Sequence, residues 1–193
     1  KRQEQMQAAF NGGLAGTQSG AVTISDTTGT IAATTLTDIT AQTKGTVTAA
    51  EADITISGTT EQVTAAIVTE ETKAVMANGK VYLSDTGTVA ATVLKAIGET
   101  TGGVVTVNGA MTITGTTEQL TNALVTEESK VIAASANVTF TDNPTGAQLA
   151  AINPKVGGTI TLNQVAQTFT GTAEQMQTAF AGGLAGTPVS YTH

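Results

Sequence analysis

The sequence predicts an α/β repeat fold, a solenoid of stacked coils in which each coil runs strand, turn, short helix. Three observations lead to this prediction. The motif Gly-Thr-(Thr/Ala)-Glu-Gln recurs at a nearly constant interval, short segments alternate apolar and polar residues as strands do, and Leu and Ile recur three residues apart as on one face of a helix. We expect about 28 residues per coil and about 57 per double unit, with parallel strands and helices along one flank.

Two markers that recur in phase set the period. The glutamates of the first marker stand at positions 4, 61, 118 and 174, which are evenly spaced to within one position. The second marker occurs as Ser25-Asp26-Thr27, Ser84-Asp85-Thr86 and Thr141-Asp142-Asn143. This spacing predicts one continuous domain made of a partial repeat (1–20) and three repeats (21–80, 81–137 and 138–193). Residues 3–17 return almost unchanged at 174–187, so we expect the chain to be a segment of a longer array.

Strands and helices alternate within each repeat. Strict alternation, as in Met111-Thr112-Ile113-Thr114, indicates strands with one buried face. We expect one apolar ladder through the core, formed by Ile24, Ile56, Leu83, Ile113, Phe140 and Phe169. The helices are marked by Leu36/Ile39, Leu94/Ile97 and Leu149/Ile152. Three helix starts match the capping box, in which a Thr hydroxyl accepts from a backbone amide of the first turn: Thr59-x-x-Gln62, Thr116-x-x-Gln119 and Thr172-x-x-Gln175.

The turns leave a second architecture open. Asn78-Gly79 and Asn108-Gly109 mark tight turns between neighbouring short strands. If these turns reverse the chain instead of turning a corner, the fold is a series of tandem β-hairpin-plus-helix modules. We favour the solenoid because repeats of this length usually stack.

Composition excludes several classes of protein. The net charge is −7 and the eight Lys and Arg residues are scattered, which argues against a nucleic-acid partner. No apolar stretch approaches the roughly 18–20 residues that span a bilayer. The chain has no Cys, which excludes disulfides and thiolate sites. An acidic, Cys-free chain in which 41 of 193 residues are Thr is typical of an extracellular or cell-surface protein.

The sequence contains no catalytic constellation. Its single His is His193, so the many Ser and Thr residues lack a base to activate them. We therefore predict a protein that is not an enzyme, with no catalytic, cofactor-binding or metal-binding residues and no cofactor.

Two recurrent patterns suggest ligands, and each also has a structural explanation. Asp26, Asp85 and Asp142, together with the Glu70-Glu71 and Glu127-Glu128 pairs, could form carboxylate rows for calcium. Alternatively, each Asp caps the Gly-Thr turn that follows it, and the Glu pairs, followed by Lys73 and Lys130, form solvated helix ends. Thr-x-Thr rows on one flat face could bind ice, although strand propensity alone explains them. The rows are Thr55-Ile56-Ser57, Thr112-Ile113-Thr114, Thr139-Phe140-Thr141 and Thr168-Phe169-Thr170.

Three motifs carry a resemblance to a known family: Gly-Thr-Val-x-x-x-x-Leu-x-x-Ile, Val-x-Leu-Ser-Asp-Thr-Gly-Thr and Thr-Ile-Thr-Gly-Thr-x-x-x-(Leu/Val). They resemble the Thr/Ala/Val-rich tandem repeats of giant bacterial, cyanobacterial-type, cell-surface or adhesin-like strand-repeat proteins. The resemblance implies a non-catalytic structural segment of a stalk, sheath or self-assembling fibre. Its partners would be neighbouring repeats and other copies, joined head-to-tail or laterally. The alternative is an adhesin-type repeat that binds a surface, a glycan or ice, with calcium as a candidate stabilising ion.

Overall fold

The structure is a computed structural model that describes residues 5, 19–49, 51–69, 74–163 and 168–181. The predicted partial repeat over 1–20 therefore lies outside the described residues, except for positions 5, 19 and 20. The chain divides into two compact units, one of residues 1–84 and 96–106 and the other of residues 85–95 and 107–193. The four repeat boundaries predicted from the sequence stay predictions.

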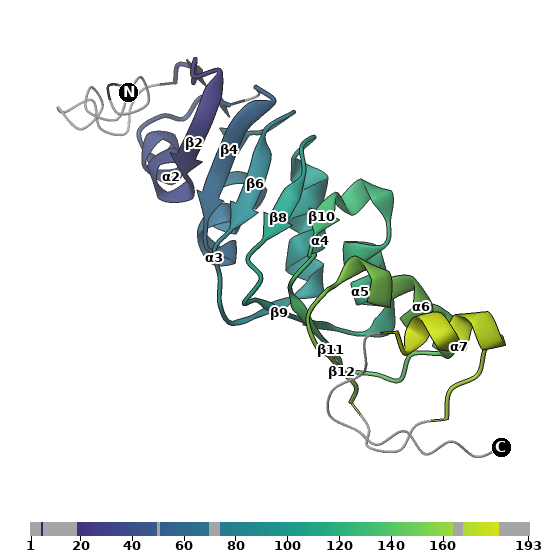
Figure 1. Ribbon diagram of the computed structural model, residues 1–193. Coiled ribbons are helices and arrows are strands. Elements are labelled where there is room, and N and C mark those ends of the chain that lie inside the picture. Colours follow the sequence, from purple (N-terminus) through teal and green to yellow (C-terminus); the bar gives the residue numbers. More distant parts are fainter. Residues whose placement is uncertain (1–4, 6–18, 50, 70–73, 164–167, 182–193) are drawn as a thin grey trace. The chain divides into compact units, whose positions relative to one another are not determined.

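The first unit contains two parallel sheets and the helices that contact them (Figure 1). One sheet has the order β1-β3-β5, with β1 at Val22–Thr23, β3 at Val47–Thr48 and β5 at Ala74–Val75. The other includes the neighbouring strands β8-β6-β4-β2, with β8 at Val105–Val107, β6 at Lys80–Leu83, β4 at Asp53–Gly58 and β2 at Thr28–Ala32. Helix α2 (Ala33–Ala41) contacts β2 and β4, and α3 (Thr60–Val63) continues into the π-helical turn η1 (Thr64–Val68).

The second unit contains a parallel sheet of order β12-β11-β9-β7. Its strands are β7 (Thr88–Ala90), β9 (Thr112–Gly115), β11 (Asn137–Phe140) and β12 (Ile160–Thr161). Helix α4 (Ala91–Thr100) begins in this unit. The other elements are α5 (Thr117–Leu124), α6 (Gly146–Ile152), α7 (Ala173–Ala179), the short strand β10 (Val131–Ile132) and the single 3-10 turns η3 (Glu127–Ser129) and η4 (Asn153–Lys155).

The predicted α/β class with parallel strands is confirmed, and so are the three helices marked by Leu and Ile. Leu36/Ile39 lie in α2, Leu94/Ile97 in α4 and Leu149/Ile152 in α6, and all six side chains are fully buried. Each of these helices is short, so burial of this face rather than intrinsic propensity stabilises it.

The predicted apolar ladder is wrong in its register. Two ladders form instead: Ile31–Ile56–Val81 in the first unit and Val89–Ile113–Val138–Ile160 in the second. Leu83 and Phe140 are buried as expected, but they pair with Gly58 and Gly115, which have no side chain to compete for the space opposite. Phe169 is half-buried and lies outside the described strands.

The ladder prediction failed because residues at equivalent positions of the repeat are not neighbours in the sheets. Ile56 pairs with Val81, and Val89 pairs with Ile113, so each strand-to-strand step spans less than half of a repeat. In the sequence β6 is followed by β7 with no intervening helix, so a short connection separates Val81 from Val89. One repeat thus contains two strand-to-strand steps and this short connection, whereas we expected two coils of equal length.

The alternative of tandem β-hairpin modules is also wrong for the described strands. A hairpin pairs consecutive strands antiparallel. The Asn78-Gly79 turn joins β5 to β6, yet β5 pairs with β3 and β6 with β4, both in parallel. At the other turn, the Asn108 Oδ1 accepts from the Ala110 amide at 3.0 Å, and this turn also leads from one parallel strand to the next.

Candidate functional site

The most frequent motif of the sequence forms the beginnings of helices. Thr59, Thr116 and Thr172 each accept a hydrogen bond from the amide of the Gln three residues later, and that Gln side chain accepts from the amide of the Thr. The two bonds measure 3.2 and 2.9 Å at Thr59. All three predicted capping boxes are therefore confirmed. A fourth at Thr145 was missed, although Thr145-Gly146-Ala147-Gln148 carries the same Thr-x-x-Gln signal.

The third copy of the second marker caps a helix that is distant in the sequence. The Asp142 Oδ1 accepts from both the amide and the hydroxyl of Thr117, each at 2.7 Å. Thr117 is the first residue of α5 and lies far before Asp142 in the chain. The prediction that this Asp caps the Gly-Thr turn after it is thus wrong for Asp142, because the parallel register brings an earlier helix within reach. One carboxylate oxygen of Asp26, Oδ2, is buried without a hydrogen-bond partner.

The carboxylates do not gather into a metal site within the described part of the chain. There, no group of three or more His, Cys, Asp or Glu side chains could hold a metal ion. Glu127 and Glu128 are exposed in the 3-10 turn after α5, where the Lys130 Nζ donates to the Glu128 carbonyl at 3.3 Å. The Glu70-Glu71 pair and Lys73 lie outside the described residues.

Two buried threonines join consecutive segments of the first unit, and sequence reasoning missed both. Thr43 is 4% exposed; its hydroxyl donates to the Gly20 carbonyl at 2.7 Å and accepts from the Gly45 amide at 2.9 Å. Thr101 is 2% exposed, and its hydroxyl donates to the carbonyl of Gly79. Thr101 also accepts from Gly103. The pattern Thr-x-Gly, which occurs at 43–45 and again one repeat later at 101–103, is a signal that could have found them.

The glycines after these threonines are required by close backbone approach. A Cβ on Gly45 would lie 2.3 Å from the Gly20 carbonyl oxygen, and one on Gly103 would lie 2.5 Å from the Gly79 carbonyl oxygen. Gly102-Gly103 thus has a packing role. These contacts hold one strand connection against the preceding one.

We use the term sheet face for the outward side of the second sheet in the first unit. Its residues are Asp53, Thr30, Thr55, Ser57, Lys80, Tyr82, Val104 and Thr106. Thr30, Thr55 and Lys80 are direct neighbours on β2, β4 and β6, and Ser57 lies beside Tyr82. A shallow hollow of about 330 Å³ lies among them. The Lys80 Nζ is 3.3 Å from the Asp53 Oδ1.

The predicted single row of Thr-x-Thr segments is split between two sheets. Thr55 and Ser57 are on β4, whereas Thr112 and Thr114 are on β9 and Thr139 is on β11. Within the second unit, threonines on three neighbouring strands still form a row, because Thr114 pairs with Thr139 and Thr139 pairs with Thr161. Thr168-Phe169-Thr170 lies outside the described strands.

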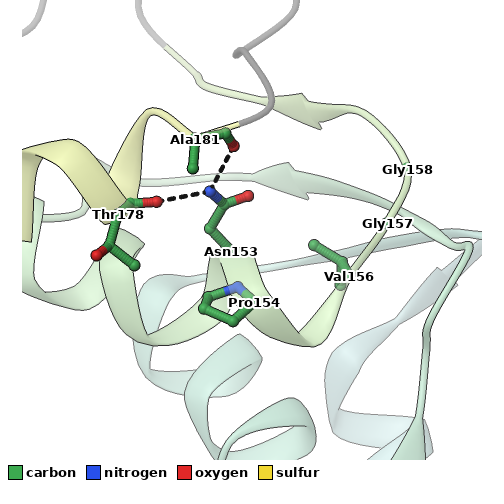
Figure 2. Close-up of a pocket in the computed structure, with 7 residues that line it drawn as sticks. All are labelled: Asn153, Pro154, Val156, Gly157, Gly158, Thr178 and Ala181. Carbon is green, nitrogen blue, oxygen red and sulfur yellow. Dashed lines mark hydrogen bonds between the residues drawn. The ribbon is translucent and has the colours of Figure 1, made fainter.

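A hollow of about 300 Å³ in the second unit is shown in Figure 2. The Asn153 side chain lies at its edge, and its Nδ2 donates to three carbonyls at the end of α7: Thr178 at 2.8 Å, Ala179 at 3.3 Å and Ala181 at 2.8 Å. The remaining lining is Pro154, Val156, Gly157 and Gly158, so the lining has no charged side chain. Asn153 thus caps the C-terminal end of α7. Phe169 and Phe180 flank that helix in the sequence. Their rings pack edge-to-face, with centroids 5.3 Å apart.

The described helices include none that is both long and apolar enough to cross a membrane. Comparison with family models, curated proteins and solved structures finds no match to the chain.

Proposed function

We propose that this chain is a non-catalytic structural repeat segment of a large extracellular or cell-surface bacterial protein. Its coils stack into a solenoid that forms a stalk, a sheath or a self-assembling fibre. The acidic, Thr-rich and Cys-free composition supports an exterior location, and the resemblance to tandem surface repeats supports the same class.

The observation that carries the proposal is the use of the recurrent polar residues. The Thr and Gln of the first marker satisfy helix termini, and Asp142 of the second marker satisfies the start of a helix much earlier in the chain. Recurrent residues of a binding or catalytic repeat would be exposed and unpaired in most copies. Here the Thr and Gln are paired within their own helix starts, and Asp142 joins two segments that are distant in the sequence, which is what a stacking unit requires.

The parallel sheets support self-association. Among the described strands, β2 and β12 each pair on one edge alone, and an open edge can accept a further strand. Residues 4–17 and 174–187 are nearly identical, so these two segments can occupy equivalent places in an array. A head-to-tail contact of this kind does not close and therefore propagates.

A tandem fusion tests the stacking. One protein joins residues 1–173 directly to residues 4–193, so that Glu174 of the array is replaced in phase by Glu4. The control joins two complete chains through a flexible Gly/Ser linker of about 20 residues. We expect the in-phase fusion to unfold in urea at a higher midpoint than the single chain, because a stacked array gains interfaces between repeats. Small-angle scattering should show an unchanged cross-section and a length increase of about 30 Å, at roughly 4.8 Å per strand step.

The linker control should unfold at the midpoint of the single chain. If both fusions unfold at that midpoint and scatter as two separate bodies, the solenoid proposal is wrong. Electron microscopy and sedimentation of the single chain then test the fibre: monomers over a broad range of concentration contradict self-assembly.

A further inference from the structure

We propose that the sheet face is a lateral docking surface for the sheet face of a second copy of this chain, related by a two-fold axis. This inference deepens the proposed structural function and rests on it. It identifies the surface through which arrays associate side by side.

The first support is the apolar character of the surface. Tyr82 and Val104 are each 38% exposed, which makes them two of the four large hydrophobic side chains most accessible to water among the described residues. They border one hollow together with Thr30, Thr55 and Ser57, whose side chains are short. On a two-fold axis the Tyr82 ring of each copy can enter the hollow of the other, which removes apolar surface from water on both sides.

The second support is the distribution of charge. With a net charge of −7, two copies of the chain repel each other overall. The hollow between α2 and α3 illustrates this, since its charged lining residues, Asp38 and Glu61, are both acidic. The sheet face instead carries one cation and one anion, Lys80 and Asp53, so these charges balance.

The same two charges make the face self-complementary. Lys80 and Asp53 are 47% and 70% exposed, so each can also reach a group on a facing surface. In a two-fold contact the same patch meets itself, and the Lys80 of each copy can lie against the Asp53 of the other. Two sheets packed face to face are about 10 Å apart, a distance that these side chains and Tyr82 can bridge.

Charge reversal on the full chain tests this arrangement. Sedimentation equilibrium should show a concentration-dependent dimer for the unchanged protein. Lys80→Asp and Asp53→Lys should each weaken dimerisation about tenfold or more, because like charges then face each other across the contact. A 1:1 mixture of the two variants should recover the dimer as a heterodimer. Thr34→Lys, on the exposed side of α2, is the control and should dimerise at least as well as the unchanged chain.

Single cysteines give a second, independent readout, because the chain has none of its own. Ser57→Cys should be cross-linked into a covalent dimer by a bifunctional maleimide that spans about 10 Å, the separation of two packed sheets, and Thr34→Cys should not. A monomeric unchanged chain, or a mixture of charge variants that stays monomeric, overturns lateral pairing. Lateral pairing is also wrong if the chain is a monomer whose sheet face, at Tyr82, binds soluble oligosaccharides. The tandem-fusion result is independent of these outcomes, so stacking can hold while lateral pairing fails.

Discussion

Replacing Asp142 with alanine removes a single carboxylate that accepts two hydrogen bonds from Thr117, both at 2.7 Å. Thr117 is 4% exposed, so water cannot replace the lost acceptor. A hydrogen bond to a charged group contributes about 1.5–3 kcal/mol to stability. The two bonds from Thr117 share one carboxylate oxygen of a half-buried side chain, so together they contribute less than twice that amount. We therefore expect Asp142→Ala to lower the free energy of unfolding by about 2–3 kcal/mol. For a chain of this size the melting temperature should fall by about 5–10 °C.

Urea unfolding monitored by circular dichroism measures the effect, with two matched variants. Asp142→Asn keeps an oxygen acceptor and loses the charge, so it should cost about 1 kcal/mol. Glu128→Ala removes an exposed carboxylate of the same unit and should change stability by less than about 0.5 kcal/mol. If Asp142→Ala and Glu128→Ala unfold at the same urea concentration, the distant cap does not stabilise the fold and our explanation of the second marker is wrong.

Three further substitutions test packing, each by urea unfolding. Thr101→Val keeps the shape and removes two hydrogen bonds of a buried hydroxyl, so it should cost about 1–2 kcal/mol; a neutral result would contradict its bridging role. Gly45→Ala should cost about 1–3 kcal/mol because of backbone overlap, whereas Gly87→Ala, with open space at its Cβ, should stay within about 0.5 kcal/mol. Equal effects of the two would refute the close approach. Leu149→Ala should cost about 2–5 kcal/mol, and a loss below about 1 kcal/mol would mean that α6 is not part of a packed core.

The candidate site was predictable where the signal is local. A capping box needs a Thr and a Gln three residues apart, and the four observed boxes obey that spacing. The acceptor role of Asp142 was not predictable in this way. Its donor, Thr117, is distant in the sequence, and neither the period of the repeat nor local turn chemistry indicates that separation. The sheet face was missed for the same reason, since it brings together residues from four strands.

The sequence by itself determined the buried Leu and Ile positions of the helices and the α/β class. These features depend on contacts between near neighbours in the chain and on the periods of the strand and the helix. The tertiary structure alone decided the register. Equivalent positions of successive repeats carry the same local signal, but hydrogen bonding pairs each strand with another that lies less than half a repeat away. That pairing depends on how closely each connection between strands packs against the preceding one. The hydrogen bonds of the buried threonines and the glycines beside them hold these connections together.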